Sequence, residues 1–223
     1  MNTNRKTATI VGILFIIGTV AGILSAVITG PILNSPEYLA EVAANSNQLV
    51  FGGLLVLIMG LALAMVPIFM YPIFKKHNES LAVGYVVFRG ALETIIYIMM
   101  VVSWLVLIVL SQEFVKAGIP NSSSFQLLGT VLLSVGDRIN PVLQIVFSLG
   151  ALMFYLLWYQ SKLIPRWLSV WGLVGVALYF VAGISALFGV DSEILVAPLA
   201  LNEMVLAIWL IVKGFNTTPV DTN

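Results

Sequence analysis

Six long apolar stretches run along the chain, and clusters of charged or turn-forming residues separate them. A helix needs about 20 mostly apolar residues to cross the hydrocarbon core of a bilayer. We therefore predict membrane-spanning helices at 8–29, 48–73, 81–109, 140–160, 166–189 and 195–213. Nothing remains for a soluble domain, so residues 1–223 are expected to form one integral membrane domain of the all-α class, a polytopic transmembrane helical bundle.

Two of the connections are long enough to hold helices of their own. Residues 36–44 begin with Pro36 and Glu37, which are favourable in the first turn of a helix. Residues 124–136 carry apolar side chains at helical spacing but reach Asp137 before they could span a bilayer. We predict a short external surface helix in each connection, with re-entry of 124–136 into the membrane as the alternative.

Composition agrees with a membrane protein and narrows its chemistry. Hydrophobic residues make up 60% of the chain and charged residues 9%, whereas soluble domains carry about a quarter charged residues. Ten basic and ten acidic residues cancel, so nucleic acid is not an expected partner. The chain has no cysteine, and its single histidine, His77, lies in a loop. Neither a catalytic site nor a metal site is expected, and no cofactor, because the usual nucleophile, base and ligand sets are absent.

The distribution of basic residues predicts the orientation. Seven of the ten lysine and arginine residues fall in the termini and loops of one face: Arg5, Lys6, Lys75, Lys76, Lys162, Arg166 and Lys213. By the positive-inside rule this face is cytoplasmic, and it holds both termini. The loops at His77 and Lys162 are then cytoplasmic, and Glu41, Asn121 and Asp191 are external.

Two charges lie within the third predicted span. Arg89 and Glu93 are four residues apart and share a helix face, with Tyr85 and Tyr97 one turn away on either side. A rise of 1.5 Å per residue from Leu81 puts Arg89 about 12 Å deep and Glu93 about 18 Å deep. A charge at the bilayer centre costs about 2.5 to 3.5 kcal/mol, so a partner is required.

The sixth span supplies that partner in Glu203, which follows Asn202 and lies about 13 Å from the external end. Pro198, about one turn earlier, is expected to open or bend this helix. We predict that Glu93 and Glu203 share Arg89, which leaves one negative charge for a proton, a cation or the cationic part of a ligand to neutralise. The candidate binding residues are Arg89, Glu93, Glu203, Asn202, Tyr85 and Tyr97. The alternative is a structural clamp between the third and sixth spans.

Other small and polar residues have simpler interpretations. Gly18, Gly22, Gly172, Gly175 and Gly183 favour close helix packing. Asp137, Arg138 and Asn140 precede Pro141 and are expected to cap and pair locally at the outer end of the fourth span, with the lining of an external cavity as the other interpretation.

Four segments resemble one family. YVVFRGALETIIYI, IPRWLSVWGLVGV and LALNEMVLAIWLIVKGF, with the amino-terminal TATIVGILFIIGTVAG, are similar to the bacterial domain-of-unknown-function 4386 family over about residues 8–215. The resemblance implies six membrane helices in a bacterial cytoplasmic (inner) membrane. It implies no reaction and provides no catalytic residues to carry over.

Two function classes fit these observations. One is a small transporter or ligand-binding protein whose Arg89, Glu93 and Glu203 contact a lipid, small amphiphile, cation or proton. The other is a noncatalytic accessory or sensor protein in which these charges are structural. A membrane-embedded enzyme fits less well, and homo-oligomerisation is open in both classes.

Overall fold

The computed structural model describes residues 3–118, 122–190 and 192–216, and all elements within these ranges are helices. In chain order they are α1 (Thr3–Leu33), α2 (Tyr38–Ala44), α3 (Ser46–Phe74), α4 (Glu79–Tyr85), η1 (Val86–Leu92), α5 (Glu93–Ala117), α6 (Ser122–Ser161), α7 (Arg166–Leu187), η3 (Glu193–Leu195) and α8 (Ala197–Val212). The element η1 is a π-helical segment, and it joins α4 to α5 in one uninterrupted helix.

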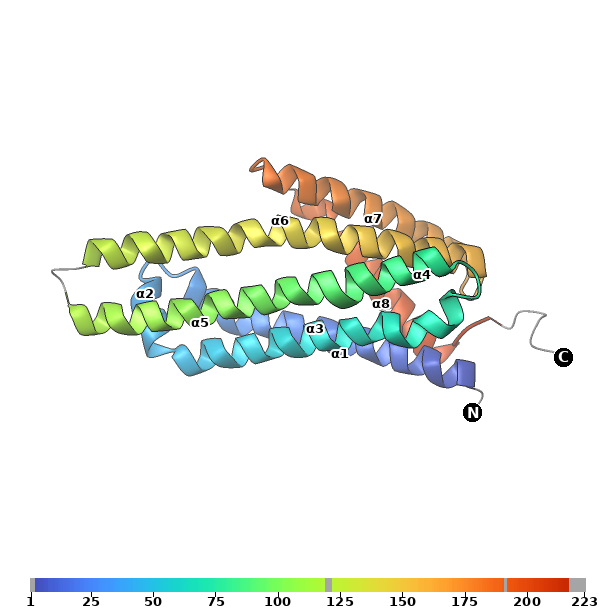
Figure 1. The fold of residues 1–223 in the computed structure, drawn as a ribbon, viewed down its shortest axis with the longest axis horizontal. Coiled ribbons are helices and arrows are strands. Elements are labelled where there is room, and N and C mark those ends of the chain that lie inside the picture. The colour runs from blue at the N-terminus through green and yellow to red at the C-terminus, as the bar shows by residue number, and fades with distance from the viewer. Residues whose placement is uncertain (1–2, 119–121, 191, 217–223) are drawn as a thin grey trace.

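The long helices lie side by side along one axis of the molecule (Figure 1). The beginning of α1 and the end of α8 lie together, because the Arg5 guanidinium donates hydrogen bonds to the carbonyl oxygens of Ile211 (2.7 Å) and Val212 (3.0 Å). These carbonyls have no partner within their own helix, so Arg5 caps α8. We refer to this end of the bundle as the terminal end and to the opposite end as the distal end.

Five helices in the described residues are long and apolar enough to cross a membrane: α1, α3, the α4–η1–α5 helix, α6 and α7. The sixth predicted span, 195–213, is a helix of 16 residues, which corresponds to a length of about 24 Å and is shorter than the hydrocarbon core of about 30 Å. Pro198 does not bend this helix. It lies in the first turn of α8, where its missing N–H costs no helix hydrogen bond.

The prediction of a separate surface helix at 124–136 was wrong. These residues are the first part of α6, which continues through Arg138, Asn140 and Pro141 to Ser161. The expected local capping by Arg138 and Asn140 was therefore also wrong, and the side chain of Asp137 is outside the described part of the chain. Contacts with other helices support this part of α6: the rings of Phe114 and Phe125 lie 6.2 Å apart, and Tyr38 donates to the Gln126 carbonyl oxygen at 3.1 Å.

The other predicted surface helix corresponds to α2. It begins at Tyr38 instead of Pro36, because the backbone N–H of Glu37 bonds to the Ser35 hydroxyl (3.2 Å) in a turn that precedes the helix. Leu39 and Val42 of α2 are buried in a distal apolar core with Leu49 and Leu107. Packing on these long helices stabilises a helix that would be too short to form alone.

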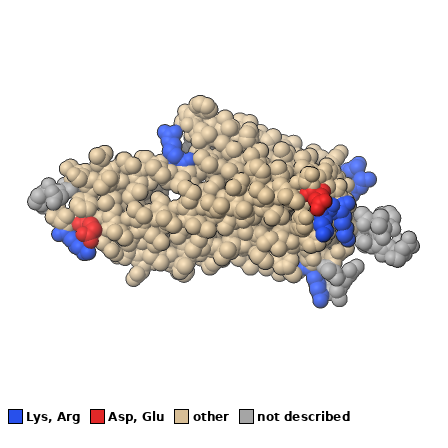
Figure 2. All heavy atoms as spheres, in the orientation of Figure 1, with Lys and Arg blue, Asp and Glu red and all other residues tan. Residues whose placement is uncertain are grey.

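The distal half of the bundle extends beyond α7 and α8 (Figure 1). The Arg138 guanidinium donates to the carbonyl oxygen of Leu187, the last residue of α7, at 3.3 Å. The part of α6 that precedes Arg138 is therefore about 24 Å long and reaches past α7. Figure 2 shows lysine and arginine gathered mainly around the terminal end, and most of the visible side between the two ends carries no charge.

Candidate functional site

The structure brings together the three charges that were predicted to lie within membrane spans. One terminal nitrogen of Arg89 lies 3.2 Å from Glu93 Oε2, and the other lies 3.5 Å from Glu203 Oε1. Arg89 and Glu93 are 3% and 1% exposed, whereas Glu203 is 18% exposed. The predicted sharing of Arg89 between two helices is thus present, with Glu93 as the closer and more buried partner.

This cluster lies near the middle of the bundle. An added Cβ at Gly150 of α6 would lie 3.3 Å from the Arg89 backbone nitrogen, so the two residues are at the same level. Counting back from Ser161 places Gly150 about 17 Å from the end of α6. Counting back from Val212 places Glu203 about 14 Å from the end of α8. Both values are close to half of a hydrocarbon core of about 30 Å.

The π-helical segment η1 presents Arg89 to the cluster. The backbone N–H of Glu93 bonds to the carbonyl oxygen of Phe88, five residues earlier, which is the π pattern. Gly150 permits α6 to approach this segment, since a Cβ there would lie 3.2 Å from the Cβ of Phe88. Short π segments inside α-helices occur frequently at functional sites. The sequence prediction of a regular helix at 81–109 missed this feature, because it depends on the packing of α6.

Tyr97 belongs to the cluster, as predicted. Its hydroxyl donates to Glu93 Oε1 at 3.0 Å, so each oxygen of Glu93 accepts one hydrogen bond. Gly60 of α3 provides space for the tyrosine ring, because a Cβ there would come within 3.1 Å of Tyr97 Cδ2. Both oxygens of the Glu93 carboxylate are therefore held by donors of the protein.

Two aromatic rings that the sequence reasoning missed also contact Arg89. The guanidinium carbon lies 4.5 Å from the ring centroid of Phe147 and 6.0 Å from that of Phe15. A cation over an aromatic face is attracted to the ring, and more strongly where water is excluded. Both phenylalanines lie in apolar runs that give no sign of this role.

Asn202 and Tyr85 make contacts outside the charged cluster, and their part in binding stays a prediction. The Asn202 amide donates to the Leu168 carbonyl oxygen of α7 at 3.1 Å, and Asn202 is fully buried. The Tyr85 ring stacks on Phe154, with centroids 4.8 Å apart. Sequence proximity placed Asn202 next to Glu203, but adjacent residues on a helix point in different directions.

A cavity of about 200 Å³ adjoins the charged cluster and has Arg89, Tyr97 and Glu203 in its wall. Thr19 of α1, Tyr179 of α7 and Met59 of α3 complete its polar and flexible lining. Sites for drug-sized ligands occupy about 300 to 1,000 Å³, so this space suits an ion with water or a small polar group. Its carboxylate wall is Glu203, because Glu93 is buried behind its two donors.

Comparisons with known proteins place the chain in a family. A search of curated proteins and a search of solved structures each found no match. A family model described as "Domain of unknown function (DUF4386)" matches residues 10–214, which run from α1 to the glycine after α8 and include all three charged residues of the cluster. The resemblance seen in the sequence is thereby confirmed, and the chain belongs to this family.

Proposed function

We propose that the protein is a membrane protein that binds a small monovalent cation or a protonated amine in the cavity beside Glu203. The observation that carries this proposal is the partly exposed carboxylate of Glu203, which lines a cavity near the middle of the bundle. Transport of such a ligand through alternating access is the use that a midplane site favours.

Charge and hydrogen bonding both support a cationic ligand. With all three groups ionised, Arg89, Glu93 and Glu203 carry a net charge of −1, and a single positive charge neutralises them. An isolated charge in hydrocarbon is costly, so occupation by a cation is favoured. Only one Glu203 oxygen has a partner among the described residues, so the carboxylate has acceptor capacity left for a ligand.

The alternative is a noncatalytic accessory or sensor protein in which the cluster clamps η1 to α8. The hydrogen bonds to both oxygens of Glu93 and the rings around Arg89 favour it, because they fix the cluster without a ligand. The two proposals differ in the role of Glu203. In the binding proposal Glu203 contacts a ligand, whereas in a clamp it only pairs with Arg89.

Ligand binding should appear as stabilisation. In detergent, we expect Li⁺, Na⁺, K⁺ or choline to raise the Tm of the native protein in a saturable manner, because a ligand at 100 times its Kd adds about 2.7 kcal/mol. The Tm is measured by thermal unfolding in the chloride salt of each cation at equal ionic strength. The Glu203→Gln variant should lose the cation-specific shift while it remains folded.

Glu113→Gln is the matched control, since Glu113 is also in a long helix but is 55% exposed and pairs only with Lys116 among the described residues. It should keep the cation-specific shift. Equal shifts for all cations, or a shift that survives Glu203→Gln, would contradict the binding proposal and favour the clamp.

We further propose that the terminal end faces the cytoplasm of a bacterial cell, in whose inner membrane the chain crosses six times, with α8 as the sixth crossing. Arg5, Lys75, Lys162 and Arg166 lie in segments at this end, in agreement with the positive-inside rule. Asn121 and Asp191, two positions predicted to be external, lie outside the described residues.

Orientation can be measured with single cysteines, because the chain has none of its own. In intact cells, a membrane-impermeant thiol reagent should label a cysteine that replaces Glu41 and should not label one that replaces His77 or Lys162. Labelling of all three after the membrane is permeabilised is the control for reactivity. Labelling at 77 or 162 in intact cells would reverse the orientation.

A further inference from the structure

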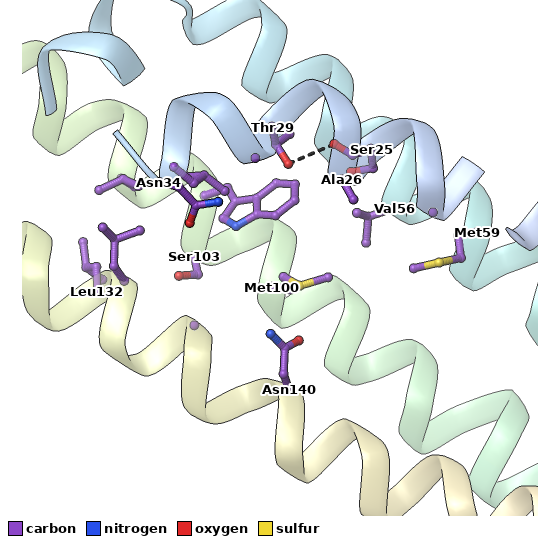
Figure 3. A pocket seen from close by; sticks show the side chains of 17 residues that line it. Ser25, Ala26, Thr29, Asn34, Val56, Met59, Met100, Ser103, Leu132 and Asn140 are labelled. Atoms are coloured by element: carbon purple, nitrogen blue, oxygen red, sulfur yellow. Dashed lines mark hydrogen bonds between the residues drawn. The ribbon is translucent and has the colours of Figure 1, made fainter. Parts of the chain in front are cut away.

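A second and larger cavity lies in the distal half of the bundle, among α1, α3, α5 and α6 (Figure 3). Its volume is about 600 Å³, which is within the range of about 300 to 1,000 Å³ for small-molecule sites. Met59 lines both this cavity and the cavity beside Glu203, so the two are neighbours. The function proposed above does not use this larger space.

Unpaired polar side chains face the larger cavity. Figure 3 shows Ser103 of α5 and Asn140 of α6 pointing into the space between the helices, with Asn34 at the end of α1 nearby. Within the described residues, the side chains of these three make no hydrogen bond. They offer amide and hydroxyl groups that both donate and accept hydrogen bonds.

Two hydroxyls on the opposite wall act only as acceptors. Ser25 donates its proton to the Gly52 carbonyl oxygen at 2.9 Å, and Thr29 donates to the Ser25 carbonyl oxygen at 2.9 Å. Their oxygens keep lone pairs for a donor in the cavity. A guest with a hydroxyl group would match this arrangement, because it both donates and accepts.

The rest of the wall is apolar and uncharged. Among the residues whose side chains the structure describes, none that lines the cavity is ionisable, so a charged guest would find no counter-ion among them. Val56, Met59, Met100, Leu107 and Leu132 provide apolar surface, and the two methionines adapt to guests of different shape. The chemistry therefore selects for a guest that is neutral and partly apolar.

From these observations we infer that the distal cavity binds an uncharged amphiphile with a hydroxyl-bearing head group, such as a monoacylglycerol or a long-chain alcohol. The head group bonds to Ser103 and Asn140, and the apolar part lies against Met59 and Met100. Asn140 lines this cavity, which was the second interpretation of the polar residues before Pro141. It does not cap a helix there, because α6 continues through this position.

Trp104 provides a direct reporter, because its indole lines the same cavity. The probe is a monoacylglycerol with a dibrominated stearoyl chain, since bromine quenches tryptophan fluorescence at contact. The full-length protein in detergent micelles should show saturable quenching. Trp104→Phe should remove the saturable part, although the chain has four other tryptophans.

The variants Ser103→Ala and Asn140→Leu should each raise the half-saturating probe concentration about threefold to tenfold, as expected for one lost hydrogen bond. Ser134→Ala is the matched control, because Ser134 is also on α6 but lines a groove outside this cavity. It should leave the titration unchanged. Monodisperse gel filtration and an unchanged Tm show that each variant is folded.

A second probe, the dibrominated stearate anion, separates head-group recognition from filling by any acyl chain. The proposal expects the anion to quench Trp104 at least tenfold more weakly at equal concentration in the micelle. Equal quenching by both probes, or titrations that Ser103→Ala and Asn140→Leu leave unchanged, would overturn it. Cation-dependent stabilisation through Glu203 is measured separately, so failure here leaves that proposal in place.

Discussion

Replacement of Arg89 by methionine is expected to lower the free energy of unfolding by about 3 kcal/mol, because it leaves two carboxylates inside the helix bundle without their cation. Methionine keeps much of the side-chain volume between Phe147 and Phe15, so the loss reports charge more than packing. Reversible unfolding in mixed micelles that contain increasing SDS provides the measurement.

Neutralising one of the two glutamates in the Arg89→Met protein should restore part of the lost stability. The structure predicts which of the two replacements restores more. Arg89→Met with Glu93→Gln leaves only Glu203, whose carboxylate reaches a cavity, and should recover about half of the loss. Arg89→Met with Glu203→Gln leaves Glu93 charged at 1% exposure and should recover less. The interaction energy of Arg89 with Glu93 should therefore exceed that of Arg89 with Glu203.

The exposed pair of Lys116 and Glu113 is the control for distance alone. Its atoms are closer, at 2.7 Å, but the side chains are 70% and 55% exposed. A cycle of Lys116→Met and Glu113→Gln should give an interaction energy of about 0.5 kcal/mol or less, as for other surface pairs. Strict additivity in the Arg89 cycles as well would mean that the three charges do not act as a unit.

The ends of most helices could be predicted because apolar runs and charged clusters alternate along the chain. The predicted 48–73 corresponds to α3, Ser46–Phe74, and 166–189 corresponds to α7, Arg166–Leu187. The continuity of α6 could not be predicted, because GDRINP has the composition of a boundary. The Arg138 guanidinium has its partner in the carbonyl oxygen of Leu187 at the end of α7, a contact between helices that the sequence does not reveal.

The members of the charged cluster could be predicted from the sequence, but their surroundings could not. An arginine and two glutamates in apolar spans require one another, and this requirement identified Arg89, Glu93 and Glu203. The direction of Asn202 toward α7, the π segment and the cation–π contact with Phe147 depend on which helices are neighbours. A single sequence does not contain that information, because apolar helices with low amphipathicity do not reveal which face is buried.

The distal cavity was the largest omission. Its polar residues are far apart in the sequence, with Asn34 directly after α1, Ser103 on α5 and Asn140 on α6. Each is a single uncharged polar residue, which a membrane protein tolerates. The cost of burying a charge, which identified Arg89 and its partners, therefore does not identify these residues. Only the crossing of α1, α5 and α6 brings them to one space.

Small residues were predicted to mark close helix contacts, and Gly172 on α7 gives this prediction its sharpest test. A Cβ at this position would overlap the ring of Tyr155 on α6. That ring is fully buried and packs on Phe154, with centroids 5.2 Å apart, so it has no free space to move into. Gly172→Ala should therefore lower the free energy of unfolding by about 3 kcal/mol, the upper part of the range for overpacked cores.

Gly136→Ala is the matched control, since a Cβ at Gly136 in the interior of α6 would have no atom within 4 Å. It should stabilise the protein by up to about 1 kcal/mol, the difference in helix propensity between glycine and alanine. Tyr155→Leu, which removes the ring, should reduce the cost of Gly172→Ala when the two are combined, and SDS unfolding of the single and double variants measures this. Equal effects of alanine at 172 and 136 would show that α6 and α7 are not packed as closely as Gly172 and Tyr155 indicate.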